Sequence, residues 1–234
     1  MELIRGYSYI YVLDASSNLR WLNFRYFPDQ IEDTDLSYTA KRIKTVTNGE
    51  FLAVEGNDIV FAQRNAPVVT TLASHTCTGE CFLGSSIKGL DFSQSTTVST
   101  EYHLAVLEKN GASLFKLETF FLDSAAPSIV FKSSYDYTSV VEKAALFALK
   151  NFFFVFKKQG ADTHFDQFTH NGTVYAFKAT ETISTFEVVK IKLLSKGANG
   201  LYLAGIKATG AYTIHRIKKT TGDNYNLLLD IFNP

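Results

Sequence analysis

Short runs that alternate apolar and polar residues recur along the whole chain, with polar turns between them. Alternation with a period of two predicts β-strands, because successive side chains of a strand point to opposite faces of a sheet. In five places a turn joins two such runs, which predicts five β-hairpins. The paired runs are 9–14 with 19–24, 51–55 with 59–62, 103–107 with 113–117, 146–149 with 152–156, and 202–206 with 212–217.

The turns inside these hairpins have the residues that reverse a chain. The segments 55–58, 109–112 and 208–211 each contain a glycine, which adopts positive φ without steric cost. The segment 15–18 offers serine and asparagine side chains that can bond back to the local backbone. Each pair of runs is therefore a credible hairpin.

Further apolar strands are expected between the hairpins, at 42–46, 68–72, 128–131, 174–177, 186–193 and 227–232. A unit of about four strands that recurs about every 50 residues is typical of a β-propeller blade. We therefore predict one all-β domain over 1–234, with five repeats at approximately 1–41, 42–86, 87–135, 136–181 and 182–234.

Two other folds remain open at this point. A β-trefoil or a β-sandwich is also built from hairpins of alternating pattern. A mixed α/β fold is a third alternative, because the segment 139–150 also has apolar residues at helical spacing and is rich in Ala, Leu, Glu and Lys.

The hairpins Phe51–Phe61 and His103–Leu117 resemble the middle two strands of degenerate WD40-type blades. The chain lacks the Trp-Asp pair that ends the third strand in that family and the Gly-His pair that precedes a blade. The resemblance is one of pattern. It implies a propeller fold and transfers no functional residues.

Composition supports strands and a globular core. The chain of 234 residues contains 20 Phe and 12 Tyr, and such rings favour a pleated, half-buried surface. The 23 basic residues balance 23 acidic ones, so no global field steers the molecule to nucleic acid or membranes. No apolar run reaches the roughly 18 residues of a membrane span, and no signal peptide is recognisable. We expect a soluble protein of the cytoplasm or nucleus.

The two cysteines lie close together with a histidine, in a segment that contains His75, Cys77 and Cys81. Thiolate and imidazole are ligands that zinc prefers, so this segment could hold part of a zinc site. No second Cys/His cluster supplies the fourth ligand. We therefore expect no metal and no cofactor, and interpret the segment as a polar loop with two thiols, or as a small disulfide ring if the protein is exported.

No phosphate-binding loop, dinucleotide fingerprint, kinase motif or hydrolase elbow is present. A propeller could bring carboxylates from different blades together, as a glycosidase requires, and Asp14, Asp58 and Asp91 lie near early blades. Aspartate is also favoured in turns, which is the simpler interpretation. We predict no catalytic set and favour a protein that is not an enzyme.

Charge is unevenly distributed along the neutral chain. The segment 29–35 is acidic, whereas the C-terminal third is basic. Basic side chains could meet an acidic partner or a phosphate backbone, although lysines on an outer strand also prevent edge-to-edge pairing. The candidate interaction residues are Lys190, Lys192, Lys207, Arg216, Lys218 and Lys219.

The repeats and the missing catalytic motifs favour a non-enzymatic scaffold that binds other proteins, as a subunit of a larger assembly. A carbohydrate-binding protein or glycosidase on a five-bladed propeller is the alternative, in which Trp21, Tyr26 or Tyr212 stack on sugar rings. Nucleic-acid binding through the basic third is a weaker alternative. The chain could also be one part of a larger propeller whose remaining blades come from a partner protein.

Overall fold

The computed structural model describes residues 2–3, 9–26, 30–47, 49–65, 67–79, 87–110, 113–141, 143–160, 162–183, 190–197, 200–206, 212–219 and 225–230. These residues form strands, turns and bends, and no helix occurs among them. None of the described segments forms an apolar helix of the length that crossing a membrane requires. The prediction of an all-β fold is confirmed.

The described strands form five sheets. Sheet 1 contains β1 (Glu2–Leu3), β2 (Tyr9–Leu13), β3 (Asn18–Tyr26) and β4 (Gln30–Thr39). Sheet 2 contains β5 (Arg42–Thr47), β6 (Glu50–Glu55), β7 (Asp58–Asn65) and β8 (Val68–Thr76). Sheet 3 contains β10 (Leu90–Gln94), β11 (Glu101–Asn110), β12 (Ser113–Asp123) and β13 (Ser128–Asp136). Sheet 4 contains β14 (Lys143–Leu149), β15 (Phe152–Gln159), β16 (Asp162–His170) and β17 (Tyr175–Ile183). Sheet 5 contains β18 (Lys190–Gly197), β19 (Gly200–Ile206), β20 (Tyr212–Lys219) and β21 (Tyr225–Asp230).

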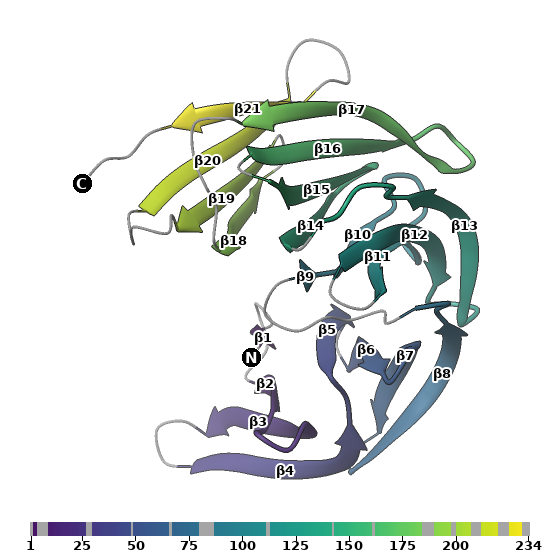
Figure 1. The fold of residues 1–234 in the computed structure, drawn as a ribbon. Helices are drawn as coiled ribbons and strands as arrows, with labels where there is room; N and C mark the ends of the chain where they lie inside the picture. Colours follow the sequence, from purple (N-terminus) through teal and green to yellow (C-terminus); the bar gives the residue numbers. More distant parts are fainter. Residues whose placement is uncertain are drawn as a thin grey trace.

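Each sheet is an antiparallel meander in which consecutive strands pair. The short β9 (Ile87–Lys88) adds a parallel edge to sheet 4, next to β14. The five sheets follow one another along an arc, and β8, β13 and β17 lie on its outer side (Figure 1). Sheets 1 and 5 stand apart at the two ends of this arc. All five expected hairpins are present.

Both faces of the middle sheets are buried, and alternate residues of one strand belong to different cores. In β6, Leu52 and Val54 pack with residues of sheet 3, whereas Phe51 and Ala53 pack with residues of sheet 1. The next core, between sheets 3 and 4, joins Leu107 of β11 to residues such as Val155 of β15. A strand buried on both faces shows a continuous apolar run in its sequence.

This double burial decides against a helix at 139–150. The segment Lys143–Leu149 is strand β14, and six of its seven residues are buried. Ala144, Leu146 and Ala148 belong to the core shared with sheet 3. The apolar residues between them lie on the opposite face, so the run contains the helical spacing only by coincidence.

Asp91 of β10 connects three sheets near the inner side of the arc. Its side chain forms an ion pair with Lys44 of β5, in sheet 2. It also accepts a hydrogen bond of 2.7 Å from the backbone N–H of Ala148 in sheet 4. Only 1% of the Asp91 surface is exposed, so the carboxylate is structural and its charge is compensated inside the fold.

His103 of β11 forms a second polar contact between sheets 3 and 4. Its Nδ1 lies 2.5 Å from the hydroxyl oxygen of Tyr175 in β17, and the rings of His103 and Phe121 are 4.6 Å apart. Burial, with the neighbouring His170, lowers the pKa of His103 to about 4. His103 is therefore neutral at physiological pH and serves as a packed polar group.

Replacing Asp91 should weaken the fold more than replacing an exposed aspartate. Asp91→Asn leaves the Lys44 ammonium without its counter-charge, and we expect a loss of about 3 kcal/mol in the free energy of unfolding. Urea denaturation of D91N and of the matched variant Asp136→Asn, at an exposed position of β13, measures the difference. Equal stability of the two variants would contradict the structural role of Asp91.

Candidate functional site

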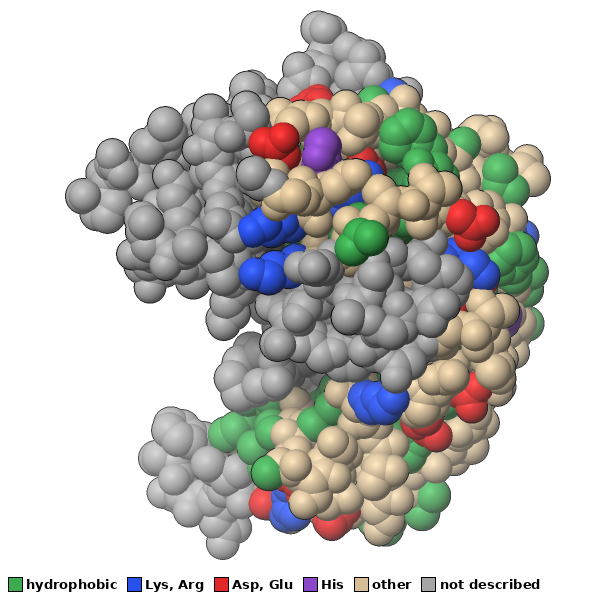
Figure 2. Space-filling view, in the orientation of Figure 1, with side chains coloured by type: hydrophobic (Ala, Val, Ile, Leu, Met, Phe, Trp, Pro, Cys, Tyr) green, Lys and Arg blue, Asp and Glu red, His purple; other side chains and the backbone are tan. Residues whose placement is uncertain are grey.

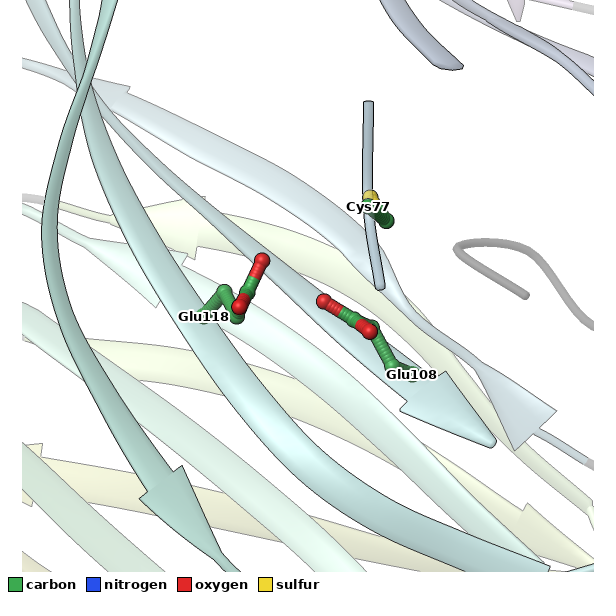
Figure 3. A group of neighbouring side chains, drawn as sticks. All are labelled: Cys77, Glu108 and Glu118. Atoms are coloured by element: carbon green, nitrogen blue, oxygen red, sulfur yellow. The ribbon is translucent and has the colours of Figure 1, made fainter. Parts of the chain in front are cut away.

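Two glutamates meet in the interior between sheets 2 and 3. Glu108 lies near the end of β11 and Glu118 on the neighbouring strand β12, with 0% and 5% of their surfaces exposed. Cys77 follows the end of β8 and faces them (Figure 3). Ligand atoms of these three residues all lie within 4.8 Å of one another. The cluster, called the Glu108–Glu118 site below, therefore joins two adjacent sheets.

The electrostatics of this site are unusual for a protein interior. Burial raises the pKa of Glu118 to about 7, and a hydrogen bond and the negative charge of Glu108 add to the rise, whereas Lys116 opposes it. Two ionised carboxylates cannot donate to each other. When both are ionised, Glu108 Oε1 and Glu118 Oε2 are buried without a hydrogen bond, so a shared proton or another cation is needed between them.

Neighbouring groups hold the remaining carboxylate oxygens. Glu108 Oε2 accepts hydrogen bonds from the hydroxyl of Thr78 at 3.0 Å and from the backbone N–H of Gly79 at 2.8 Å. The Lys116 ammonium lies 3.5 Å from Glu118 Oε1, and Nε2 of His75 lies 3.9 Å from Glu118 Oε2. Burial lowers the pKa of His75, which favours its neutral form. Among the described side chains, the Lys116 ammonium therefore faces two carboxylates.

The equivalent place between sheets 3 and 4 is built differently. A register shift follows Thr119 in β12 and Gln167 in β16, so Glu118 and Asp166 occupy the same position before a bulge. Glu118 pairs with Val106 of β11, and Glu108 lies two residues after Val106. In the same way, Asp166 pairs with Val155 of β15, and Lys157 lies two residues after Val155. Lys157 and Asp166 form an ion pair of 2.6 Å.

The third member of each set is also equivalent. Cys77 directly follows β8, and Tyr137 directly follows β13. The Lys157 ammonium lies 4.9 Å from the centre of the Tyr137 ring. Sheet 4 thus compensates its buried acid with a lysine where sheet 3 has a second acid.

The segment with the expected metal ligands contributes to this site in part. His75 and Cys77 lie beside the two glutamates, whereas Cys81 is outside the described residues. Cys77 is disulfide-bonded, so its sulfur is not a thiolate in this state. The sequence has one other cysteine. Glu108 and Glu118 were not anticipated; the signal in the sequence is a charge within a strand, two residues after buried Val106 and one after buried Leu117.

A pocket of about 390 Å³ opens elsewhere, between the inner strands of sheets 2, 3 and 4. The rings of Phe92 and Tyr102 form part of its wall and lie edge to face at 5.8 Å. Ser93, Gln94 and Lys150 add polar groups, and the Ser93 hydroxyl donates to the Lys150 carbonyl. The pocket combines aromatic surface with convergent polar groups, as small-molecule sites do.

The expected interaction residues lie mostly in sheet 5. Lys190 and Lys192 are on β18, and Arg216, Lys218 and Lys219 are on β20. The register pairs Lys192 with Ala204 and Arg216 with Tyr202 of the intervening strand β19. Lys207 lies outside the described residues. Their role in binding stays a prediction.

The acids considered for a glycosidase have local partners. Asp14 accepts hydrogen bonds from the backbone N–H groups of Ser16 and Asn18 in its own turn. Asp58 accepts one from the Thr76 hydroxyl at 2.6 Å, and Asp91 connects the sheets as described. These contacts fit turn and packing roles.

The aromatic residues considered for sugar stacking are placed only in part. The guanidinium of Arg64 lies 4.1 Å from the centre of the Trp21 ring, whose side chain packs against the core between sheets 1 and 2. Tyr26 ends β3 and Tyr212 begins β20, and their side chains lie outside the described part of the structure. Trp21 therefore already has a cation on its ring.

Solved structures identify the arrangement of the sheets. A functionally unknown protein from Desulfotomaculum acetoxidans superimposes with a TM-score of 0.62 at 8% identity, over 95% of this chain and 65% of that one. The Dos1 propeller superimposes with a TM-score of 0.54 at 8% sequence identity, over 94% of this chain and 55% of that one. The N224Q mutant of the Aleuria aurantia lectin, in complex with α-methyl-L-fucoside, superimposes with a TM-score of 0.52 at 12% sequence identity. The match covers 94% of this chain and 72% of that one.

The chain has a β-propeller-like fold. This confirms the predicted fold class over the trefoil and sandwich alternatives. The chain spans less than two thirds of the length of the Desulfotomaculum protein and of the Dos1 propeller. No family model matches the sequence, and no curated protein is significantly similar to it. The resemblance to WD40 repeats thus extends to the fold and no further.

The two equivalent buried pairs should respond in opposite ways to loss of charge. Lys157→Met leaves Asp166 buried without its counter-charge, and we expect a loss of about 3 kcal/mol in unfolding free energy. Glu108→Gln removes one of two adjacent acids and supplies an amide N–H to Glu118, so stability should be unchanged or higher. Urea denaturation of both variants at one pH measures this. A destabilisation of E108Q as large as that of K157M would contradict the difference.

Proposed function

We propose that the protein is a non-enzymatic interaction module that binds an extended segment of another protein along the outer strands β13 and β17. The observation that carries this proposal is the exposure of large apolar side chains on these strands. Val130, Phe131 and Phe177 expose 47%, 48% and 41% of their surfaces. Val130 and Phe131 point to opposite faces of β13, so both faces of this outer strand have exposed apolar surface, which a binding partner could cover.

One aromatic contact joins the two strands across the boundary between their sheets. β13 and β17 lie in contact along the outer side of the arc. Tyr135 of β13 stacks on Phe177 of β17 with their ring centres 5.3 Å apart. Green apolar side chains follow this rim in the space-filling view (Figure 2). Aromatic residues of this kind are enriched in the centres of protein interfaces.

The chemistry of the partner follows from the position of these strands. β13 and β17 are the last strands of their sheets, so each has an edge with unpaired backbone groups. An extended segment can pair with such an edge and place alternate apolar side chains on the exposed rings. Pairing of this kind needs no catalytic group, in agreement with an interaction module.

The proposal is tested by affinity purification from the native source with the double variant Phe131→Glu and Phe177→Glu. The unmodified protein should recover a stoichiometric protein partner, and the double variant should recover at least tenfold less, because two charges would be buried in an apolar contact. Hydrogen exchange in the purified complex should slow in β13 and β17.

Val68→Glu provides the matched control, since Val68 is 58% exposed on the equivalent outer strand β8. This variant should retain the partner. A protein that remains alone at every concentration, or a complex that protects other strands, would refute the proposal.

Carbohydrate binding is the second candidate function, favoured by the pocket between the inner strands. Its rings, Phe92 and Tyr102, can contact the apolar face of a sugar, while Gln94 and Lys150 can bond hydroxyl groups. A glycan array should then show a ligand whose binding is at least tenfold weaker in Phe92→Ala, with Phe177→Ala on the outer rim as the control. Silence on the array and on a panel of chromogenic glycosides would remove this candidate.

A further inference from the structure

We propose that the Glu108–Glu118 site binds one zinc ion when the disulfide of Cys77 is reduced, with Cys77, Glu108 and Glu118 as ligands. The charges of the site favour a bound cation. In the equivalent set of sheet 4, the Lys157 ammonium compensates Asp166 at 2.6 Å. Sheet 3 has Glu108 in the place of that lysine, so a carboxylate stands where sheet 4 has an ammonium.

Two carboxylate oxygens of the site have no partner besides each other among the described residues. Glu108 Oε1 and Glu118 Oε2 are buried and receive no hydrogen bond from a third described residue, so they depend on one shared proton between the two carboxylates. Lys116 lies beside Glu118, but its ammonium also donates to the Thr78 hydroxyl at 2.9 Å. It offsets one of the two carboxylate charges. A divalent ion would satisfy both orphaned oxygens at once.

The ligand atoms of the site also suit zinc. A thiolate and two carboxylates are ligands that zinc accepts, at distances of about 2.0–2.3 Å from the ion. Their ligand atoms already lie within 4.8 Å of one another, so small side-chain rotations bring them around one ion. Water would be the fourth ligand, because His75, whose Nε2 lies 3.9 Å from Glu118 Oε2, is not among the residues whose ligand atoms cluster here.

The state of Cys77 controls the site, because a disulfide sulfur has no negative charge and binds zinc poorly. A dithiol reductant gives two electrons and two protons to the disulfide, the S–S bond breaks, and the reductant becomes a disulfide. Zinc binding then displaces the proton of the Cys77 thiol to solvent. Thr78 and Gly79, which bond Glu108, are in the same loop as Cys77. Metal binding and loop position are therefore coupled.

The test is calorimetric titration of the full chain with zinc chloride, after reduction and removal of the dithiol under nitrogen. The reduced protein should bind one zinc per chain, and the oxidised protein at least tenfold more weakly. Cys77→Ser, Glu108→Gln and Glu118→Gln should each lower the affinity at least tenfold in the reduced state. Asp136→Asn, at an exposed site of β13, is the matched control.

Cys81→Ser tests whether the disulfide prevents zinc binding, since this variant leaves Cys77 without the only other cysteine of the chain. This variant should bind zinc without any reductant. Circular dichroism of each variant verifies folding, and cobalt(II) should give a thiolate charge-transfer band in the reduced protein alone. Equal zinc affinity in the oxidised and reduced states, or unchanged affinity in C77S, would overturn the proposal, as would loss of binding in C81S.

Discussion

The fold depends on sheets that are apolar on both faces. A sheet of this kind cannot stop at one neighbour, because burial of only one face leaves the other in water. In β6, alternate residues belong to two different cores, so sheet 2 is held between sheets 1 and 3. The arc of described strands continues to sheets 1 and 5 at its two ends (Figure 1). Polar groups such as Asp91 can enter this stack only with partners from several sheets.

The same constraint explains what the sequence predicts well and what it does not. Hairpins such as Phe51–Phe61 are visible because the strand pattern and the turn chemistry are local. The segment 143–149 is ambiguous in the sequence, because burial of both faces removes the alternation that separates a strand from a helix. The boundaries of the repeats, at 41, 86, 135 and 181, stay predictions, although each sheet lies almost wholly within one repeat.

The candidate site was harder to predict than the fold, for a physical reason. His75 and Cys77 are neighbours in the sequence and suggested a ligand set there, but Glu108 and Glu118 come from two further strands of another sheet. Their approach depends on how sheet 2 packs on sheet 3 and on the register between β11 and β12. Asp91 is a second case. The sequence favours a turn role for this carboxylate, whereas in the structure it joins three sheets, which only the contacts with Lys44 and Ala148 reveal.

Because the sheets repeat, the Glu108–Glu118 site can be compared with the equivalent positions of the neighbouring sheets. Val60, Glu118 and Asp166 occupy equivalent positions in sheets 2, 3 and 4. Each lies on the strand β7, β12 or β16, two residues before the residue at which the register shifts. A buried apolar residue such as Val60 has no charge to compensate, and the negative charge of Asp166 is compensated by the Lys157 ammonium. Two acids together are tolerated only where something else carries the positive charge. Because the surrounding strands are the same in all three sheets, this excess acid is a local property of sheet 3, and the cysteine beside it gives the site a chemistry that its equivalents do not have.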